Sequence, residues 1–81
     1  MVIRVQLFGA FRDVVDQAHI DIVLPEAATV GELRAEIVRL YPKLGVRIGR
    51  FPFALGDSFA KDSEVLREGV EVTIVGLVGG G

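Results

Sequence analysis

One helical pattern, flanked by strand-like patterns, limits what this chain can fold into. The clearest local signal is a capping box at Thr29-Val30-Gly31-Glu32. In this motif the threonine side-chain oxygen accepts a hydrogen bond from an amide of the first turn, and the glutamate side chain accepts one from the threonine amide. Pro42 ends the helix at or just before Tyr41. The pattern predicts an amphipathic helix of about three turns. Its apolar stripe is Val30, Leu33, Ile37, Leu40 and Tyr41, and its polar side is Glu32, Arg34, Glu36 and Arg39.

Segments that alternate with a period of two predict strands on both sides of this helix. They cover residues 2–8, a second run that Pro25 closes, and residues 70–75. The side chains expected to face inward are Ile3, Val5 and Leu7, then Ile20, Ile22 and Leu24, and finally Val70, Val72 and Ile74. Those expected to face outward are Arg4, Gln6 and Phe8, then His19, Asp21 and Val23, and finally Glu71, Thr73 and Val75.

The remaining segments carry weaker signals. Residues 10–17 suggest a helical turn within a loop, and residues 43–50, which contain two glycines, are interpreted as loop. Residues 51–55 and 58–60 predict short strands joined by a tight turn at Gly56-Asp57. Pro52 indicates an edge position or the start of a strand.

The order strand, strand, helix, strand, strand, strand predicts an α+β domain with the β-grasp, or ubiquitin-like, architecture. In this plan a mixed sheet packs on one main helix, and the first and last strands lie parallel at its centre. Eighty-one residues suffice for one such domain. We expect a folded body at residues 1–75 and a flexible C-terminal tail at residues 76–81.

The tail, Gly76-Leu77-Val78-Gly79-Gly80-Gly81, ends in three glycines directly after the last predicted strand. Glycine loses more backbone entropy on folding than any other residue, so one interpretation is a frayed end. The other is an arm that enters a partner, because a segment with few side chains fits a narrow channel. Six extended residues reach roughly 20 Å, enough to carry the terminal carboxylate deep into another protein.

Composition excludes several functional classes. The net charge is -2 and the arginines are scattered among acids, so the chain carries no basic patch for nucleic acid. It contains no cysteine, which excludes disulfides, iron–sulfur clusters and thiolate zinc sites. No apolar run is long enough to cross a bilayer and no signal peptide opens the sequence. We expect a cytoplasmic protein that does not bind membranes or nucleic acid.

An apolar patch is expected on the sheet face away from the helix. Phe8 and Val75 end the first and last predicted strands on that face, and Phe59 could join them from a short strand. Such a patch is a candidate partner-binding surface, although one or more of these residues could instead pack beneath a loop. His19 is interpreted as a surface residue, since one histidine without other ligands makes no metal site. Arg12 and Asp13 are interpreted as a solvated loop pair.

The chain resembles the MoaD/ThiS family of bacterial sulfur-carrier proteins, and MoaD in particular. Three segments carry this resemblance: Leu7-Phe8-Gly9-Ala10-Phe11-Arg12-Asp13, Thr29-Val30-Gly31-Glu32-Leu33-Arg34, and Leu66-Arg67-Glu68-Gly69-Val70-Glu71-Val72. The terminal pair Gly80-Gly81 matches the functional signature of the family. In place of the prolines usual between the last strand and the tail, this chain has Gly76-Leu77.

The resemblance implies a sulfur carrier without catalytic activity of its own. An E1-like (MoeB-like) enzyme would use ATP to adenylate the Gly81 carboxylate, and sulfur would then replace AMP to leave a thiocarboxylate. The tail of Gly80, Gly79, Val78 and Leu77 would enter the large catalytic subunit of molybdopterin synthase (MoaE-like) and donate the sulfur. The chain itself would bind no cofactor and no metal.

Three alternatives remain open from the sequence. The chain could carry sulfur to another product, such as the thiazole of thiamine, cysteine or a thiolated tRNA base. It could be a ubiquitin-like modifier whose tail forms amide bonds with target lysines. It could also be a structural binding domain, which would tolerate deletion of Gly80-Gly81.

Overall fold

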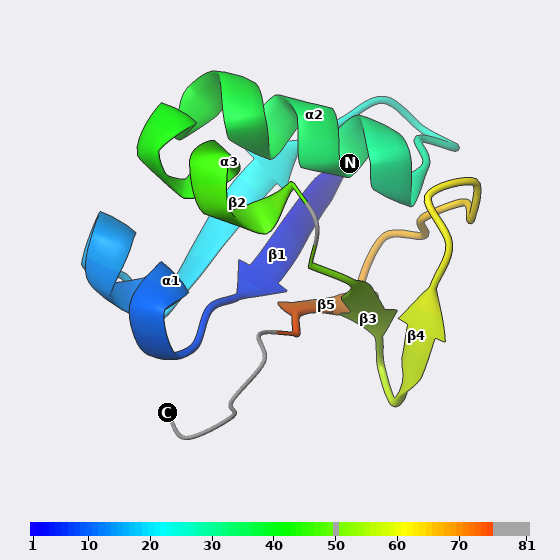
Figure 1. Ribbon diagram of the computed structural model, residues 1–81. Helices are drawn as coiled ribbons and strands as arrows, with labels where there is room; N and C mark the ends of the chain where they lie inside the picture. Colours follow the sequence, from blue (N-terminus) through cyan, green and yellow to red (C-terminus); the bar gives the residue numbers. More distant parts are fainter. Residues whose placement is uncertain (50, 76–81) are drawn as a thin grey trace.

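The computed structural model describes residues 1–49 and 51–75, with the backbone alone at positions 46 and 47. The strands are β1 (Val2–Gln6), β2 (His19–Val23), β3 (Phe53–Leu55), β4 (Ser58–Ala60) and β5 (Glu71–Ile74). The helices are α1 (Gly9–Val15), α2 (Val30–Leu40) and α3 (Pro42–Ile48). Helix α2 crosses one face of the sheet with α3 beside it, and α1 lies at one end (Figure 1).

The sheet has the order β2-β1-β5-β3-β4. Strand β1 pairs in parallel with β5, whereas the β1–β2, β3–β4 and β3–β5 pairs are antiparallel. The first and last strands therefore lie together near the centre, which confirms the predicted β-grasp architecture.

Helix α2 begins as the sequence predicts. The Glu32 amide donates to Thr29 Oγ1 over 3.2 Å, and the Thr29 amide donates to Glu32 Oε1 over 2.9 Å, which completes the capping box. Val30, Leu33 and Ile37 are fully buried, but the prediction for Leu40 is wrong because this side chain is 45% exposed. The helix ends at Leu40, and α3 continues the cover of the sheet in its place.

The prediction of a loop at residues 43–50 is wrong, because the chain forms α3 from Pro42 to Ile48. Proline suits the first position of a helix, since its φ is already helical and its missing N–H needs no partner there. Leu44 and Ile48, four residues apart, are both fully buried. Gly45 permits close approach of the helices, because a Cβ there would lie 2.9 Å from the Val38 Cα.

The other elements differ from prediction mainly in their ends. Residues 10–17 contribute more than one turn, since α1 runs from Gly9 to Val15. Strand β1 ends at Gln6, before Leu7 and Phe8. Strands β3 and β5 are likewise shorter than predicted, and Val70 is half-buried just before β5. Pro52 precedes β3, so it marks the start of a strand that lies inside the sheet.

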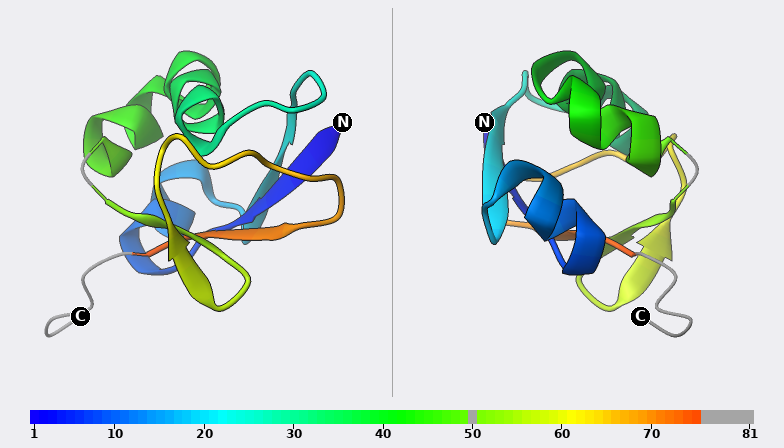
Figure 2. Two further views of the ribbon diagram at one scale, coloured as in Figure 1. Left: turned by 90° about the vertical axis from the view of Figure 1, so that its right-hand side faces the viewer. Right: turned by 60° about the vertical axis from the view of Figure 1, so that its left-hand side comes forward.

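The core lies between the inner sheet face and the helices, as the two views in Figure 2 show. Its sheet residues include the predicted inward sets of the first two strands, together with Phe53, Val72 and Ile74. Among the described residues, no polar or charged residue is fully buried. No helix in this part of the chain is long and apolar enough to cross a membrane.

Candidate functional site: the tail root and the outer sheet face

The predicted reactive group, the Gly81 carboxylate, lies outside the described residues, as do Gly80, Gly79, Val78 and Leu77. The structure instead describes the point from which this tail starts. Strand β5 enters the centre of the sheet between β1 and β3 and ends at Ile74. One residue later, the Val75 amide donates a hydrogen bond to the Pro52 carbonyl over 2.9 Å. We call this rung, Val75 N–H to Pro52 O, the tail root.

The outer sheet face, which points away from α2, carries a continuous row of paired residues. The pairs His19–Gln6, Gln6–Thr73, Thr73–Ala54 and Ala54–Phe59 join all five strands. Because paired residues share a sheet face, and the neighbours Phe53 and Ile74 are buried, this row points outward. The interpretation of His19 as lying on the outer face agrees with its register opposite Gln6, although it is half-buried.

The two predicted aromatic contact residues are both exposed. Phe8 is 62% exposed and Phe59 is 70% exposed, so neither packs beneath a loop. Phe8 lies just before α1 with an extended backbone, so the alternation of β1 continues and its side chain faces outward. Beyond the last Gln6–Thr73 pair, the parallel register places Phe8 and the half-buried Val75 at the same end of neighbouring strands.

Phe59 lies farther from the tail root than the sequence suggested. Its strand, β4, is the sheet edge, and β3 separates it from β5. With about 5 Å between neighbouring strands, Phe59 lies roughly 10 Å across the face from β5. Phe8 and Val75 therefore form the part of the patch nearest the tail, and Phe59 extends it toward the edge.

The opposite end of the outer face is charged. Arg4 lies between Asp21 and Glu71 in the register, and its Nε donates to Asp21 Oδ1 over 3.0 Å. The Arg4 hydrogen bond holds the pKa of the Asp21 carboxyl below its usual value. Both side chains are well exposed to solvent, so this pair orders the surface more than it stabilises the fold. The same end of the outer face also carries the paired and exposed Val2 and Val23, so both ends of the face have exposed apolar side chains.

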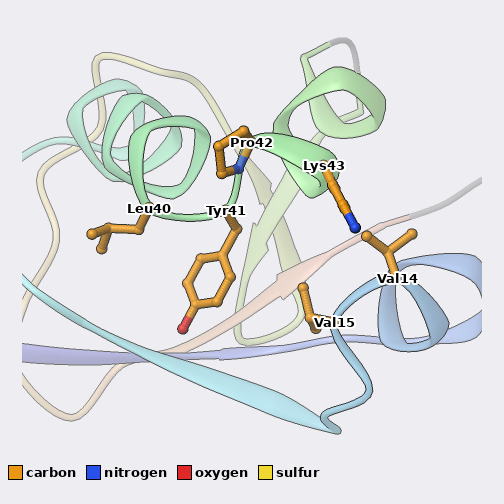
Figure 3. Close-up of a pocket in the computed structure, with 6 residues that line it drawn as sticks. All are labelled: Val14, Val15, Leu40, Tyr41, Pro42 and Lys43. Carbon is orange, nitrogen blue, oxygen red and sulfur yellow. The ribbon is translucent and has the colours of Figure 1, made fainter.

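On the helix side, an apolar groove of about 420 Å³ lies between α1 and the junction of α2 with α3. Val14 and Val15 line it from α1, and Leu40, Tyr41, Pro42 and Lys43 line it from the junction (Figure 3). The sequence pattern did not predict this groove, because residues 43–50 were expected to form a loop. The four-residue spacing of Leu44 and Ile48, directly after a proline, was the signal that could have revealed it.

The described part of the chain contains no cluster of three or more histidine, cysteine or acidic residues able to hold a metal ion. Arg12 and Asp13 lie exposed on α1 and not in a loop, contrary to the interpretation above. The arrangement that the described residues do provide is a fixed exit for the chain beside an exposed apolar surface.

Comparison with solved structures shows the same fold elsewhere. SAMP1 from Haloferax volcanii has 20% sequence identity and a TM-score of 0.88, with 100% of both chains covered. A putative molybdopterin converting factor subunit 1 from Pyrococcus furiosus has 22% identity and a TM-score of 0.77, over 91% of this chain and 94% of that one. A structure of the complex of subunits 1 and 2 of the molybdopterin-converting factor from Helicobacter pylori matches with 24% identity and a TM-score of 0.66, over 93% and 92%.

At these identities the likeness concerns the fold. The family assignment comes from the sequence, where the model described as the ThiS family matches residues 5–81. That match includes the body from residue 5 onward, the tail root and the terminal glycines. The chain is therefore a β-grasp protein of the ThiS family of sulfur carriers.

Proposed function

We propose that this chain carries sulfur as a thiocarboxylate on Gly81. An E1-like (MoeB-like) enzyme binds the outer sheet face and receives the tail. A carboxylate oxygen of Gly81 attacks the α-phosphorus of ATP, which forms the acyl-adenylate and releases pyrophosphate. Sulfur supplied at the sulfide level (HS⁻) then attacks the acyl carbon, AMP leaves with the electron pair of the broken C–O bond, and a thiocarboxylate remains.

The observation that carries this proposal is the tail root. Val75 is tied to the central part of the sheet through Pro52, and six residues follow it. Those residues span roughly 20 Å when extended, and the last three are glycines that fit a narrow channel. A rigid body with an arm starting from its sheet centre suits a protein that other enzymes hold while they act on its end.

The sequence of the tail supports a role in which the partner enzyme supplies the catalytic groups. A carboxylate is a poor electrophile until it gains a good leaving group, and residues 76–81 contain no histidine, cysteine or lysine for nucleophilic or general-base work. The ATP site and the catalytic groups therefore belong to the partner enzyme. This chain is its covalent substrate and binds no cofactor itself.

We further propose that the acceptor pathway is molybdenum cofactor biosynthesis, with this chain as the small subunit of molybdopterin synthase. Two proteins of the same fold are described as subunits of a molybdopterin-converting factor, and one of them is seen with a second subunit. The expected partner is a large catalytic (MoaE-like) subunit. Phe8, Val75 and Phe59 would form the surface that it contacts, with the tail entering its active site.

A second candidate function is protein modification. SAMP1, described elsewhere as a small archaeal modifier protein, matches this chain over its whole length. In that case the Gly81 acyl-adenylate would lead to an amide bond with a lysine amine of a target. The two functions share their first step and differ in their product.

Intact mass spectrometry of the chain purified from its native cell distinguishes the products. A sulfur carrier gains the mass difference of one oxygen replaced by one sulfur, and this gain disappears on treatment that hydrolyses thiocarboxylates. A modifier yields lysine-linked adducts. Deletion of Gly80-Gly81 must abolish the product in either case, and a product that survives this deletion would contradict both.

Co-purification then tests the pathway. Recovery of a large molybdopterin synthase subunit, with transfer of sulfur to its pterin precursor by the thiocarboxylated chain, supports the molybdenum cofactor assignment. Transfer to a thiazole, cysteine or tRNA product would replace that assignment with another sulfur-carrier pathway.

A further inference from the structure

Arg34 reaches from α2 to the segment that leads into β3. Its Nη1 donates to the Ile48 carbonyl over 2.9 Å and to the Phe51 carbonyl over 2.8 Å. Its Nη2 donates to Asp62 Oδ1 over 3.0 Å, and its guanidinium carbon lies 4.2 Å from the centroid of the Phe53 ring. The side chain is only 16% exposed, although the sequence places it on the polar side of the helix.

These contacts end one peptide unit away from the tail root. Arg34 holds the carbonyl of Phe51 and the ring of Phe53, and the residue between them, Pro52, supplies the carbonyl that accepts from Val75. The Phe51 ring also meets Phe11 of α1 edge-on, with centroids 5.1 Å apart. The two residues that flank the Pro52 acceptor are therefore both contacted by Arg34 of α2, and Phe51 is contacted by α1 as well.

Burial of the Arg34 side chain does not by itself explain why an arginine occupies this position. Arg34 Nε is buried and finds no hydrogen-bond partner among the described residues. A methionine would bury a similar stem against Phe53 without that unpaired donor, so what the guanidinium adds is its fixed geometry toward two carbonyls and a carboxylate.

We infer that Arg34 is a positioning residue for the tail root. By fixing Phe51 and Phe53, it holds the Pro52 carbonyl in place, and with it the direction in which the tail leaves the sheet. This inference rests on the proposed function, because the direction of the tail matters only if the tail is the working part. Arg34 does not touch the reacting atoms.

Amide hydrogen exchange tests the structural half of the inference. In Arg34→Met, the exchange rate of the Val75 amide, divided by that of Val5 in the central strand β1, should rise about tenfold, since the acceptor segment loses two hydrogen bonds. Val5 reports opening of the whole fold, so a rise at Val75 that exceeds the rise at Val5 marks a local change at the tail root. Arg39→Met is the matched control, because Arg39 lies on the same helix and bonds Glu36 at the surface. An unchanged ratio in Arg34→Met would overturn the inference.

Arg34→Lys and Asp62→Asn separate the contributions. Lysine keeps the charge but lacks the planar fork, so it should restore the ratio only in part. Asp62→Asn leaves both carbonyl bonds of Arg34 intact and should leave the ratio at the wild-type value. Full recovery in Arg34→Lys would show that charge alone is sufficient and would overturn the role of the fork.

Adenylation kinetics test the functional half, measured as pyrophosphate release with ATP and the purified adenylating enzyme. A loosened tail root makes it harder to place the Gly81 carboxylate but leaves the outer sheet face intact. In Arg34→Met we therefore expect kcat to fall about three- to tenfold with KM unchanged. A rise in KM with unchanged kcat would contradict this inference. If the wild-type chain is not adenylated at all, the proposed function fails, while the exchange ratio still decides the role of Arg34.

Discussion

Phe8 and Phe59 are large apolar side chains left in solvent on a face with no helix against it in the described structure. An exposed aromatic that gains nothing from folding is a candidate for burial against a partner. The outer face also carries exposed apolar residues at its other end, where Val23 is 71% exposed. Position relative to the tail root, and not exposure alone, should therefore decide which side chain contributes to docking.

The first prediction uses this contrast. Phe8→Ser and Phe59→Ser should each raise KM for the adenylating enzyme, or Kd for the large subunit, by roughly tenfold, because each removes a contact worth more than about 1 kcal/mol. Neither variant should be destabilised by more than about 0.5 kcal/mol, since both side chains are exposed and serine is a favoured residue at the N-cap of α1. Val23→Ser is the matched control and should leave binding unchanged. Equal losses of binding in all three variants would mean that position relative to the tail root does not decide which side chain contributes to docking.

The second prediction concerns the Arg4–Asp21 pair. Because Arg4 donates to Asp21, the carboxyl has a lowered pKa in the folded state. Such a group stabilises the fold above the pKa of the unfolded chain, near 4, and that stability is lost as pH falls through the lower folded pKa. In Arg4→Met, a carboxyl-detected NMR titration should show the Asp21 midpoint moving up toward its ordinary value. Arg39→Met should instead move Glu36 and leave Asp21 unchanged.

The sequence predicted the outward direction of Phe8, left open whether Phe59 joins the patch or packs beneath a loop, and did not predict the burial of Arg34. The two-residue period of the first strand was enough to assign Phe8 to the outer face. Arg34 lies on the polar side of a helical pattern, and its burial depends on Ile48, Phe51 and Asp62 folding over it. Those partners are 14 to 28 residues away in sequence, so no local pattern could reveal them.

At the scale of secondary-structure elements, segments with a clear hydrophobic period were predicted correctly. The segment that was assigned from its glycine content alone was predicted wrongly. The capping box and the apolar stripe located α2, and alternation located β1 and β2. Helix α3 does not follow from the sequence pattern alone, because Gly45 and Gly49 are typical of loops. Gly45 instead serves helix–helix packing, where α3 crosses the Val38 backbone.

The third prediction tests this packing. In Gly45→Ala the new Cβ would lie 2.9 Å from the Val38 Cα and 3.0 Å from its Cβ, so the two helices must separate. This overpacking should reduce the free energy of unfolding by about 1–3 kcal/mol, more than the gain of up to about 1 kcal/mol from better helix propensity. Urea denaturation measures the difference. Gly49→Ala is the control, since its nearest neighbour would lie 3.9 Å away, and it should not be destabilised.

At the scale of the whole molecule, the body and the tail can be separated in principle. Within residues 1–49 and 51–75, the buried core residues run from Ile3 to Ile74, and the Val75 amide bonds the Pro52 carbonyl directly after β5. A boundary at residue 75 stays a prediction from the sequence, where apolar alternation stops and the glycine-rich segment starts. The identity of the partner and the path of the tail depend on surfaces of other proteins, which no pattern within 81 residues encodes.

The fourth prediction is that residues 1–75 fold without the tail. A chain ending at Val75 should unfold in urea within about 0.5 kcal/mol of the full chain, because the described core and the tail root are intact. A chain ending at Thr73 loses Ile74, which is 1% exposed, together with the Val75–Pro52 hydrogen bond. It should lose about 2–5 kcal/mol, comparable to emptying a buried isoleucine site. Neither truncated chain should be adenylated, so stability and function separate at Val75. A large loss of stability on removing residues 76–81 alone would mean that the tail belongs to the folded body. The division into a folded body and a separate tail would then be wrong.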